Sequence, residues 1–461
     1  MKSPHFIQNT KSLLKLAYPI LIAQLIQNLM GFADTVMAGR VSSTDMAAVA
    51  VASSVWLPLI LTIYGVIMAL AAIVSQYAGS GSYKKVVNAT YQTIWIALAL
   101  GVGLIAFYYA LAPVIENNVE LEPQLKSLMF EYLGYIVWGA PGFCLYLALR
   151  NYAEGMSFTR PTMIISIIGL IINVPANYIF IYGEFGMPAL GGAGCGIATA
   201  LVYWAMFLGM LIYVYISKHL EKVSLFKRAY GIDVNEIKHI LKVGVPIALS
   251  LLFEVSLFSV VAILLAPLGA DIVASHQIAI NFSGLVFMVP LSFAMALTIK
   301  VGYCVGQQEY QQAKDICKDA VIFGLMIAVV TAVATIIFRT QIAEIYTTEA
   351  PVIELAASLM FLAALFQFSD AIQVISAGAL RGYKDTTSIL IITFISYWFV
   401  GLTLGVVLAM TDLLVPKMGA SGFWIGFISG LTVAAVFLAW RLKFIQNRYE
   451  QSALKAELIN Q

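Results

Sequence analysis

Residues 13–38 read LLKLAYPILIAQLIQNLMGFADTVMA, and this first long apolar stretch decides the fold class. A helix that crosses a membrane needs about 20 predominantly apolar residues, and this stretch is long enough. A cleavable signal peptide would have a shorter apolar core, followed closely by a cleavage site with small residues. We therefore expect residues 13–38 to form a retained transmembrane helix.

Stretches of the same kind recur along the whole chain, which is 61% hydrophobic and only 11% charged. About a quarter of the residues in a typical soluble protein are charged. No stretch alternates polar and apolar residues over the ~10 positions of a membrane β-strand, which excludes a barrel. The sequence predicts an all-α membrane protein with twelve transmembrane helices, at residues 13–38, 46–74, 89–113, 127–149, 161–182, 193–216, 241–266, 273–299, 317–338, 354–380, 387–411 and 420–441.

The basic residues predict the orientation of these helices. If the N-terminus is cytoplasmic, the inner segments carry all of the 26 Lys and Arg residues except Arg40, Lys126, Arg339 and Lys417. Positively charged loops remain on the cytoplasmic side of a membrane. Because the number of spans is even, we expect both termini to be cytoplasmic.

Two halves of the chain resemble each other. Residues 14–20 (LKLAYPI) resemble 241–247 (LKVGVPI), and residues 148–152 (ALRNY) resemble 379–383 (ALRGY), at nearly constant offsets. The pattern predicts a duplication with six helices in each half, related by an axis along the membrane normal. Chance similarity between apolar helices is the alternative. The predicted parts are an N-lobe at 1–216, a basic cytoplasmic linker at 217–240 and a C-lobe at 241–461.

Three acidic residues fall inside predicted spans, namely Asp34, Glu254 and Asp370. A charged side chain at the bilayer centre costs at least ~2.5–3.5 kcal/mol, so such residues usually serve a site or a pathway. At 1.5 Å of rise per residue, Glu254 and Asp370 lie roughly 15–20 Å from the cytoplasmic side, whereas Asp34 lies in the outer part of its helix. We expect these three carboxylates to bind the transported cations. A structural hydrogen bond between helices is the alternative for each of them.

Amide side chains accompany the carboxylates. Asn173 and Asn177 are one helical turn apart, at a depth near that of Asp34, and a carboxylate with amide oxygens suits a hard cation such as Na⁺. Polar stripes in spanning helices must face protein or water. The sequence therefore predicts further cavity-lining amides, although each could instead join two helices. These are Gln27, Gln277, Asn281, Gln367 and Gln373.

Motifs for enzyme chemistry are missing from the sequence. The chain has no G-x-x-x-x-G-K-[ST] loop for ATP, no H-E-x-x-H and no G-x-S-x-G. A net charge of +2 without a basic run argues against a nucleic-acid partner. We expect a secondary transporter without a cofactor rather than an enzyme. A cationic substrate and a coupling ion would compete for the same carboxylates, and such competition produces antiport.

The chain also resembles a known family, the multidrug and toxic compound extrusion (MATE) transporters, and within it the bacterial NorM type. The resemblance is carried by residues 30–39 (MGFADTVMAG), Pro246, 253–255 (FEV), 274–279 (ASHQIA), Asp370 and 378–385 (GALRGYKD). It implies a V-shaped fold of two six-helix lobes in the bacterial inner membrane. It also implies multidrug efflux of cationic drugs and dyes, coupled to Na⁺ more than to H⁺.

The resemblance implies site residues as well. Asp34, Asn173 and Asn177 match the cation site of the N-lobe, and Glu254 with Asp370 matches that of the C-lobe. Related sequences can carry a tyrosine four residues before this last aspartate. Here that position is Phe366, so no phenol oxygen is available there.

Two other functions remain as alternatives. A flippase for lipid-linked oligosaccharides would line its cavity with Arg and Lys, whereas these spans carry carboxylates. A membrane-embedded transferase would need paired catalytic groups near an interface, and the sequence shows none. We expect a monomer in the lipid bilayer whose partners are small cationic drugs and dyes and the coupling ion, Na⁺ or H⁺.

Overall fold

The computed structural model describes residues 4–118, 120–227 and 229–459, and nearly all of them are helical. The first half of the chain contains seven α-helices. They are α1 (Pro4–Gly39), α2 (Ser43–Gly79), α3 (Tyr83–Asn118), α4 (Pro123–Ile136), α5 (Ala140–Gly155), α6 (Arg160–Tyr182) and α7 (Gly194–Ile216). Four short 3₁₀ turns accompany them: η1 (Val137–Gly139), η2 (Glu184–Gly186), η3 (Gly191–Ala193) and η4 (Lys218–Val223).

The second half of the chain has the same character. Its α-helices are α8 (Val234–Leu265), α9 (Ala270–Gly306), α10 (Tyr310–Tyr346), α11 (Ala350–Gly382), α12 (Thr386–Phe394), α13 (Thr403–Met410) and α14 (Ala420–Ile459). A 3₁₀ turn, η5 (Ala266–Leu268), follows α8. Between α12 and α13 the backbone forms a π-helical segment, η6 (Ile395–Leu402), without leaving the helical path.

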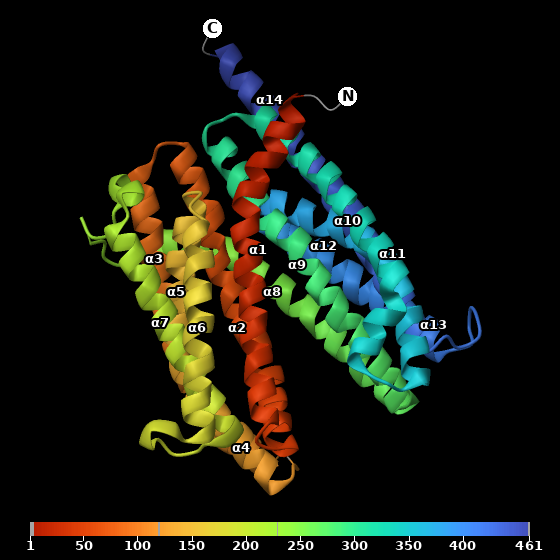
Figure 1. Ribbon diagram of the computed structural model, residues 1–461. Coiled ribbons are helices and arrows are strands. Elements are labelled where there is room, and N and C mark those ends of the chain that lie inside the picture. Colours follow the sequence, from red (N-terminus) through yellow and green to blue (C-terminus); the bar gives the residue numbers. More distant parts are fainter. Residues whose placement is uncertain (1–3, 119, 228, 460–461) are drawn as a thin grey trace. The chain divides into compact units, whose positions relative to one another are not determined.

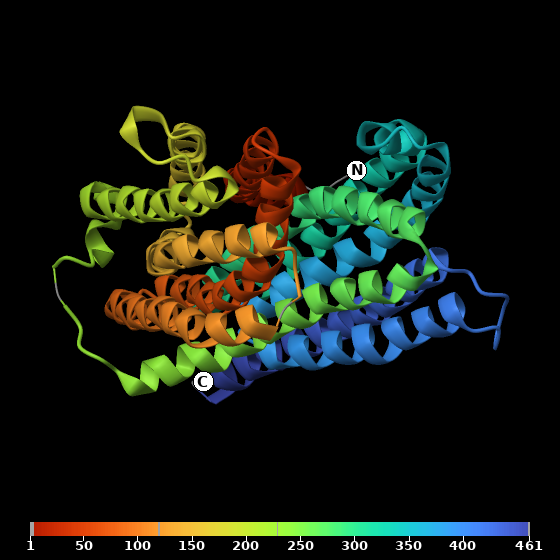
Figure 2. The ribbon, with the colours of Figure 1, turned by 90° about the horizontal axis from the view of Figure 1, so that it is seen from below.

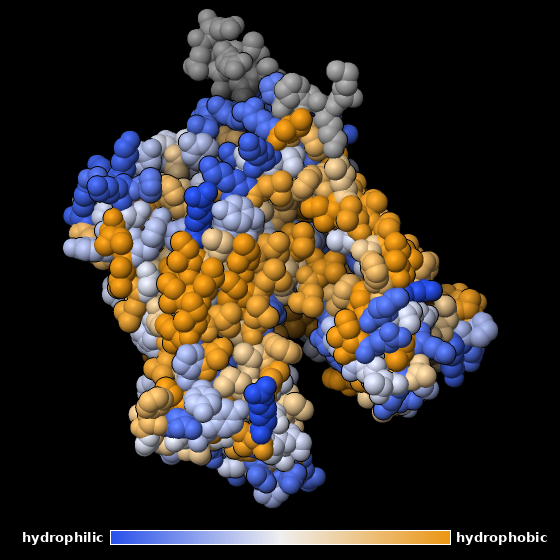
Figure 3. Space-filling view, viewed as in Figure 1, coloured by the Kyte–Doolittle hydropathy of each residue, from blue (hydrophilic) through white to orange (hydrophobic). Residues whose placement is uncertain are grey.

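Twelve helical segments of the described chain are long and apolar enough to cross a membrane, which confirms the predicted all-α fold with twelve spans. The fourth span joins α4, η1 and α5, and the eleventh joins α12, η6 and α13. Most helices extend beyond the predicted apolar stretches, because helical hydrogen bonding continues into the polar residues that flank them. On the face shown in Figure 3, hydrophobic side chains cover the middle of the long helices and hydrophilic ones gather near the helix ends.

The chain divides into two compact units. One contains Tyr18–Ala248, and the other contains the chain up to Ala17 together with the chain from Leu249 onward. Both divisions fall inside helices, α1 and α8, near the prolines at repeat-related positions, Pro19 and Pro246. The domain boundaries proposed from the sequence, 1–216, 217–240 and 241–461, stay a prediction, as do the cytoplasmic termini.

The unit that contains Tyr18–Ala248 is built around α5. This helix packs on α2, α3 and α7, and α7 packs in turn on α6 (Figure 1). The basic segment after α7 is held against this unit through its backbone. Tyr91 donates a hydrogen bond to the carbonyl of Leu225 at 2.7 Å, and Tyr152 donates one to the carbonyl of Val223 at 2.7 Å.

The other unit is built around α11, which packs on α9, α10 and α14. The helix α14 also lies along α12, η6 and α13, seen as the neighbouring blue ribbons in Figure 2. The apolar core of this unit includes Leu257, Phe366, Tyr397, Trp424 and Phe427. The helix α11, which carries Asp370, Gln367 and Gln373, therefore lies among several others, and these three side chains are buried.

Candidate functional site

Asp34 lies near the C-terminal end of α1 and is only 5% exposed. Its Oδ1 accepts hydrogen bonds from the Nδ2 atoms of Asn177 at 2.6 Å and Asn173 at 3.0 Å. Its Oδ2 accepts a third from the hydroxyl of Thr199 at 3.1 Å. The three residues predicted to share a depth are thus in direct contact, and α6 and α7 present all of the donors.

The helical repeat explains this arrangement. Asn173 and Asn177 lie one turn apart on α6, so both amides face the same carboxylate, and Asn177 also donates to Oδ1 of Asn173 at 3.2 Å. Both asparagines are fully buried. Oδ1 of Asn177 has no hydrogen-bond partner among the described residues. A free carbonyl oxygen therefore lies beside a carboxylate whose charge is stabilised by three neutral donors.

Sequence reasoning missed Thr199. Hydroxyl side chains in helices usually donate to a carbonyl of their own helix one turn back, and most of those described here do so. Nothing in the sequence separates Thr199 from them. Only the packing of α7 against α6 and α1 reveals that its hydroxyl bonds to Asp34 instead.

Asp370 and Glu254 lie on α11 and α8 of the other unit. Asp370 is 4% exposed, while Glu254 is partly buried. They are close enough for their charges to interact. In contrast to Asp34, neither carboxylate accepts a hydrogen bond from any residue in the described part of the chain. Two like charges in a nonpolar surrounding repel each other, and each favours the binding of a cation.

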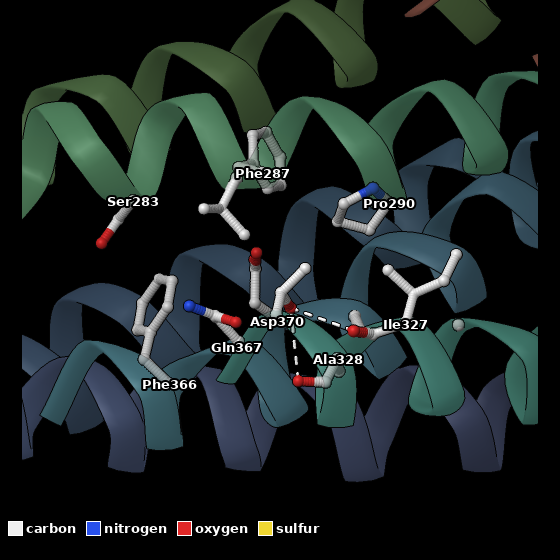
Figure 4. A pocket seen from close by; sticks show the side chains of 12 residues that line it. Ser283, Phe287, Pro290, Ile327, Ala328, Phe366, Gln367 and Asp370 are labelled. Atoms are coloured by element: carbon white, nitrogen blue, oxygen red, sulfur yellow. Dashed lines mark hydrogen bonds between the residues drawn. The ribbon is translucent and has the colours of Figure 1, made fainter. Parts of the chain in front are cut away.

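A small cavity of about 20 Å³ lies next to Asp370, between α9, α10 and α11. The carboxylate points from α11 into the cavity, on the side of Phe287 (Figure 4). Two more oxygens there, Oγ of Ser283 and Oε1 of Gln367, are buried and have no partner among the described residues. The hydroxyl of Thr331 is already bonded to carbonyls of its own helix, shown as dashed lines. A volume of this size holds about one water molecule or a small ion.

No salt bridge involves Asp34, Glu254 or Asp370 anywhere in the described ranges. Arg381 lies near the end of α11, and its guanidinium is within electrostatic range of Glu254. Each carboxylate is therefore set in an apolar helix bundle without a paired cationic side chain in contact. This arrangement suits a movable cation better than a permanent ion pair.

The other predicted amides differ in their surroundings. Gln367 and Gln373 are buried on α11 with Asp370, and the amide of Gln367 donates to Thr335 at 3.1 Å. Gln27 is partly buried on α1, and its Nε2 has no partner in the residues described. Gln277 and Asn281, by contrast, are exposed on α9 and do not line the cavity at Asp370.

His276 is the one histidine inside a predicted span. Its imidazole is buried on α9 beside the rings of Trp424 and Phe427, at centroid distances of 6.1 and 6.4 Å. Across the described residues, no group of three or more His, Cys, Asp or Glu side chains is placed to hold a metal ion. Asp34 in one unit, and Glu254 with Asp370 in the other, offer carboxylate oxygens together with neutral oxygens nearby, and such oxygens are hard ligands.

Comparison with known proteins places this geometry in a family. The family model described as MatE matches residues 19–179 and 246–407, one match in each half of the chain. The Probable multidrug resistance protein NorM of Shewanella oneidensis is 50% identical over 98% of this chain and 98% of its own length. The Multidrug resistance protein MdtK of Proteus mirabilis is 49% identical over 97% of this chain and 98% of its own length.

Solved structures agree at the level of the fold. The eukaryotic MATE transporter AtDTX14 superposes with a TM-score of 0.86 over 97% of this chain and 99% of its own, at 18% sequence identity. A MATE protein in the bent conformation superposes with the same TM-score over 98% of this chain, at 20% identity. With the family model, the full-length relatives and the twelve-span fold in agreement, the chain belongs to the MatE family and is a membrane transporter, not an enzyme.

Proposed function

We propose that this transporter exports several kinds of cationic organic compound by antiport against inward-moving Na⁺ or H⁺, with alternating access to the two sides of the membrane. The names of relatives that share about half of the sequence support the breadth of the substrates, because they are called multidrug resistance proteins. The charge of the substrate and the identity of the driving ion are inferred from the site.

The observation that carries the proposal is the state of the three carboxylates. Asp34, Glu254 and Asp370 lie inside spanning helices, and none of them is in a salt bridge with a described residue. A buried charge without a partner costs several kcal/mol, so a cation that enters the site is bound strongly. An organic cation and a coupling ion would then neutralise the same charges in turn.

Competition of this kind couples the two movements. When the coupling ion occupies the carboxylates, the substrate is released, and when the ion leaves, the substrate can bind again. Binding energy that differs between the loaded states shifts the population of conformations open to each side. Neither ATP hydrolysis nor a cofactor is needed, because the ion gradient supplies the free energy.

Na⁺ is the coupling ion that we favour over H⁺. Each carboxylate cluster has neutral oxygens close by, from Asn177 in one unit and from Ser283 and Gln367 in the other. A proton needs one carboxylate oxygen, whereas Na⁺ needs several oxygen ligands at once. The resemblance to NorM-type transporters points the same way. We also propose that the protein is a monomer in the bacterial inner membrane. Both termini would lie in the cytoplasm, and the two lobes would be formed by residues 1–216 and 241–461.

Dye transport in proteoliposomes tests the proposal. Purified protein would be reconstituted, ethidium supplied as the cationic dye, and Na⁺ and pH gradients imposed separately. We expect ethidium to move against at least one of the two gradients, and the Na⁺ gradient to drive the larger flux. Movement under neither gradient would overturn the antiporter. Transport of an anionic lipid in the same vesicles, without ethidium transport, would favour the flippase instead.

A further inference from the structure

Tyr397, on the π-helical segment η6, has a buried hydroxyl with no explanation in the packing. The residue is 1% exposed and belongs to the apolar core of its unit. Its hydroxyl has no hydrogen-bond partner among the described residues. It nevertheless lies within electrostatic range of both Glu254 and Asp370. Burying a hydroxyl without a hydrogen bond costs about 1–3 kcal/mol, so such a group usually has a ligand or a water to bind.

The backbone around Tyr397 is itself unusual. π-Helical turns are rare, are poorer in packing than α-helix, and occur often at functional sites. Two consecutive residues of this segment, Ser396 and Tyr397, are buried. The π-helical segment thus carries the buried phenol, whereas Ile395 and Phe399 of the same segment are exposed.

Two contacts hold the π-helical segment in place. The indole of Trp398 donates a hydrogen bond to the carbonyl of Phe253 at 3.2 Å, the residue directly before Glu254. On the opposite side, a Cβ added to Gly430 of α14 would lie 2.8 Å from the carbonyl oxygen of Ser396, so only glycine allows this approach. Tyr397 is thus fixed between α8 and α14, with the carboxylate-bearing turn of α8 attached to its own segment.

The neighbouring helix α11 offers no phenol to this pair of carboxylates. Position 366 lies one turn before Asp370, so its side chain shares a face with the carboxylate, but it is phenylalanine. The Phe366 ring packs on Trp424 at a centroid distance of 6.1 Å. The hydroxyl in this core that lies near both acids belongs to Tyr397, on the eleventh span and not on the tenth.

We propose that the hydroxyl of Tyr397 is an oxygen ligand of the coupling cation at Glu254 and Asp370, and that η6 exists to place it there. This inference rests on the proposed antiport function. The phenol keeps its proton and offers an oxygen lone pair to the cation. It is therefore a neutral ligand beside the two carboxylates and adds no third negative charge. Tyr397 then determines affinity for the inorganic cation rather than the rate of dye movement.

Removing the hydroxyl tests the proposal. In proteoliposomes, Tyr397→Phe should raise the Na⁺ concentration for half-maximal ethidium efflux by about tenfold, the effect of losing one contact to a charged partner. The maximal efflux rate at saturating Na⁺ should stay close to that of wild type. Equilibrium binding of ²²Na⁺ to purified protein should weaken by the same factor. The thermal unfolding temperature should not fall, because the hydroxyl has no protein partner to lose.

A matched control and a rescue variant sharpen the test. Tyr383 is also buried in this unit, but its hydroxyl lies beside Gln446, Cys317 and Tyr449 instead of the two acids. Tyr383→Phe should leave Na⁺ dependence unchanged. In the double variant Tyr397→Phe with Phe366→Tyr, a phenol returns one turn from Asp370, and Na⁺ affinity should recover to within about threefold of wild type.

The outcomes separate this inference from the function on which it rests. If wild type moves ethidium with Na⁺ and Tyr397→Phe has the same Na⁺ dependence, the inference fails while the antiporter stands. If only a pH gradient drives wild type, the assignment of Tyr397 as an ion ligand is overturned. If Tyr397→Phe does not fold, Phe366→Tyr in the wild-type background decides: tighter ²²Na⁺ binding supports the inference, and unchanged binding contradicts it.

Discussion

The carboxylate of Asp34 and the carboxylate pair of Glu254 and Asp370 are stabilised in different ways. Asp34 accepts three hydrogen bonds from neutral side chains, at 2.6, 3.0 and 3.1 Å. Glu254 and Asp370 accept none from the described residues and are within electrostatic range of each other instead. Both arrangements keep negative charge inside an apolar helix bundle. Only the first of them supplies the protein donors that replace water.

This difference shows that the two halves surround their buried acids with different partners. The offset of 227 that relates Pro19 to Pro246 also relates Gln27 to Glu254, so a neutral amide stands in one half where the other has an acid. The pair in the second unit is undercompensated and should attract a cation more strongly. The site at Asp34 is organised by its donors and should bind cations with less gain in energy.

The largest expected effect comes from neutralising Asp370. Asp370→Asn removes a charge that no protein donor supports, so ethidium efflux should fall by at least about tenfold while the protein stays folded. The thermal unfolding temperature should stay the same or rise, because an uncompensated buried charge is removed. Asp412→Asn, at an exposed acid between α13 and α14, is the control and should transport normally. A folded Asp370→Asn protein with wild-type efflux would break the comparison.

Asp34→Asn should have the opposite effect on stability. The new amide group would keep one oxygen for Asn177 and Asn173, but its nitrogen could no longer accept from Thr199, and the charge that strengthens all three bonds would be gone. Weakening these buried hydrogen bonds costs about 1–3 kcal/mol, so the unfolding temperature in detergent should fall. Thermal unfolding of both variants in the same detergent checks this. Shifts of the same sign and size for Asp34→Asn and Asp370→Asn would show that the two sites do not differ as described.

Thr199→Val removes one of the three donors to Asp34 and keeps the shape of the side chain. The free energy of unfolding should decrease by about 1 kcal/mol, the usual value of one hydrogen bond. Thr199→Ser, which keeps the hydroxyl, should restore most of that loss. If Val and Ser variants unfold alike, the hydroxyl does not stabilise Asp34.

The smallest effect is expected on α9. Gln277 and Asn281 are exposed and lie outside the cavity at Asp370. Replacing both by alanine should change the free energy of unfolding by no more than about 0.5 kcal/mol. Half-saturating Na⁺ for ethidium efflux should stay at its wild-type value. A large shift in Na⁺ dependence would place these amides in the ion path.

The sequence predicted the fold well for a physical reason. A helix in lipid must make all of its backbone hydrogen bonds internally and must contain about 20 apolar residues. The length and hydropathy of a stretch therefore determine whether it spans the membrane. The contact of Asp34 with Asn173 and Asn177 was also predictable, because rise per residue places all three at one depth. The pairing of Asp370 with Glu254 was expected from the family resemblance, which implies that both belong to one cation site.

Other features could not be read from the sequence. The hydroxyl of Thr199 looks like any helical threonine until α7 is packed. The inward direction of Tyr397 depends on a π-helical turn, which shifts the helical register and leaves no motif. Gln277 and Asn281 share one helix face by their one-turn spacing, and their role as cavity-lining amides stays a prediction.

Competition between ions at the buried acids can be measured directly. Ethidium binding to the purified transporter would be followed by fluorescence while Na⁺ and H⁺ are titrated separately, in wild type and in Asp370→Asn. We predict that at least one of the two ions displaces ethidium competitively from wild type, and that this displacement is largely lost in the variant. Ethidium affinity in wild type that is independent of both ions would contradict the account.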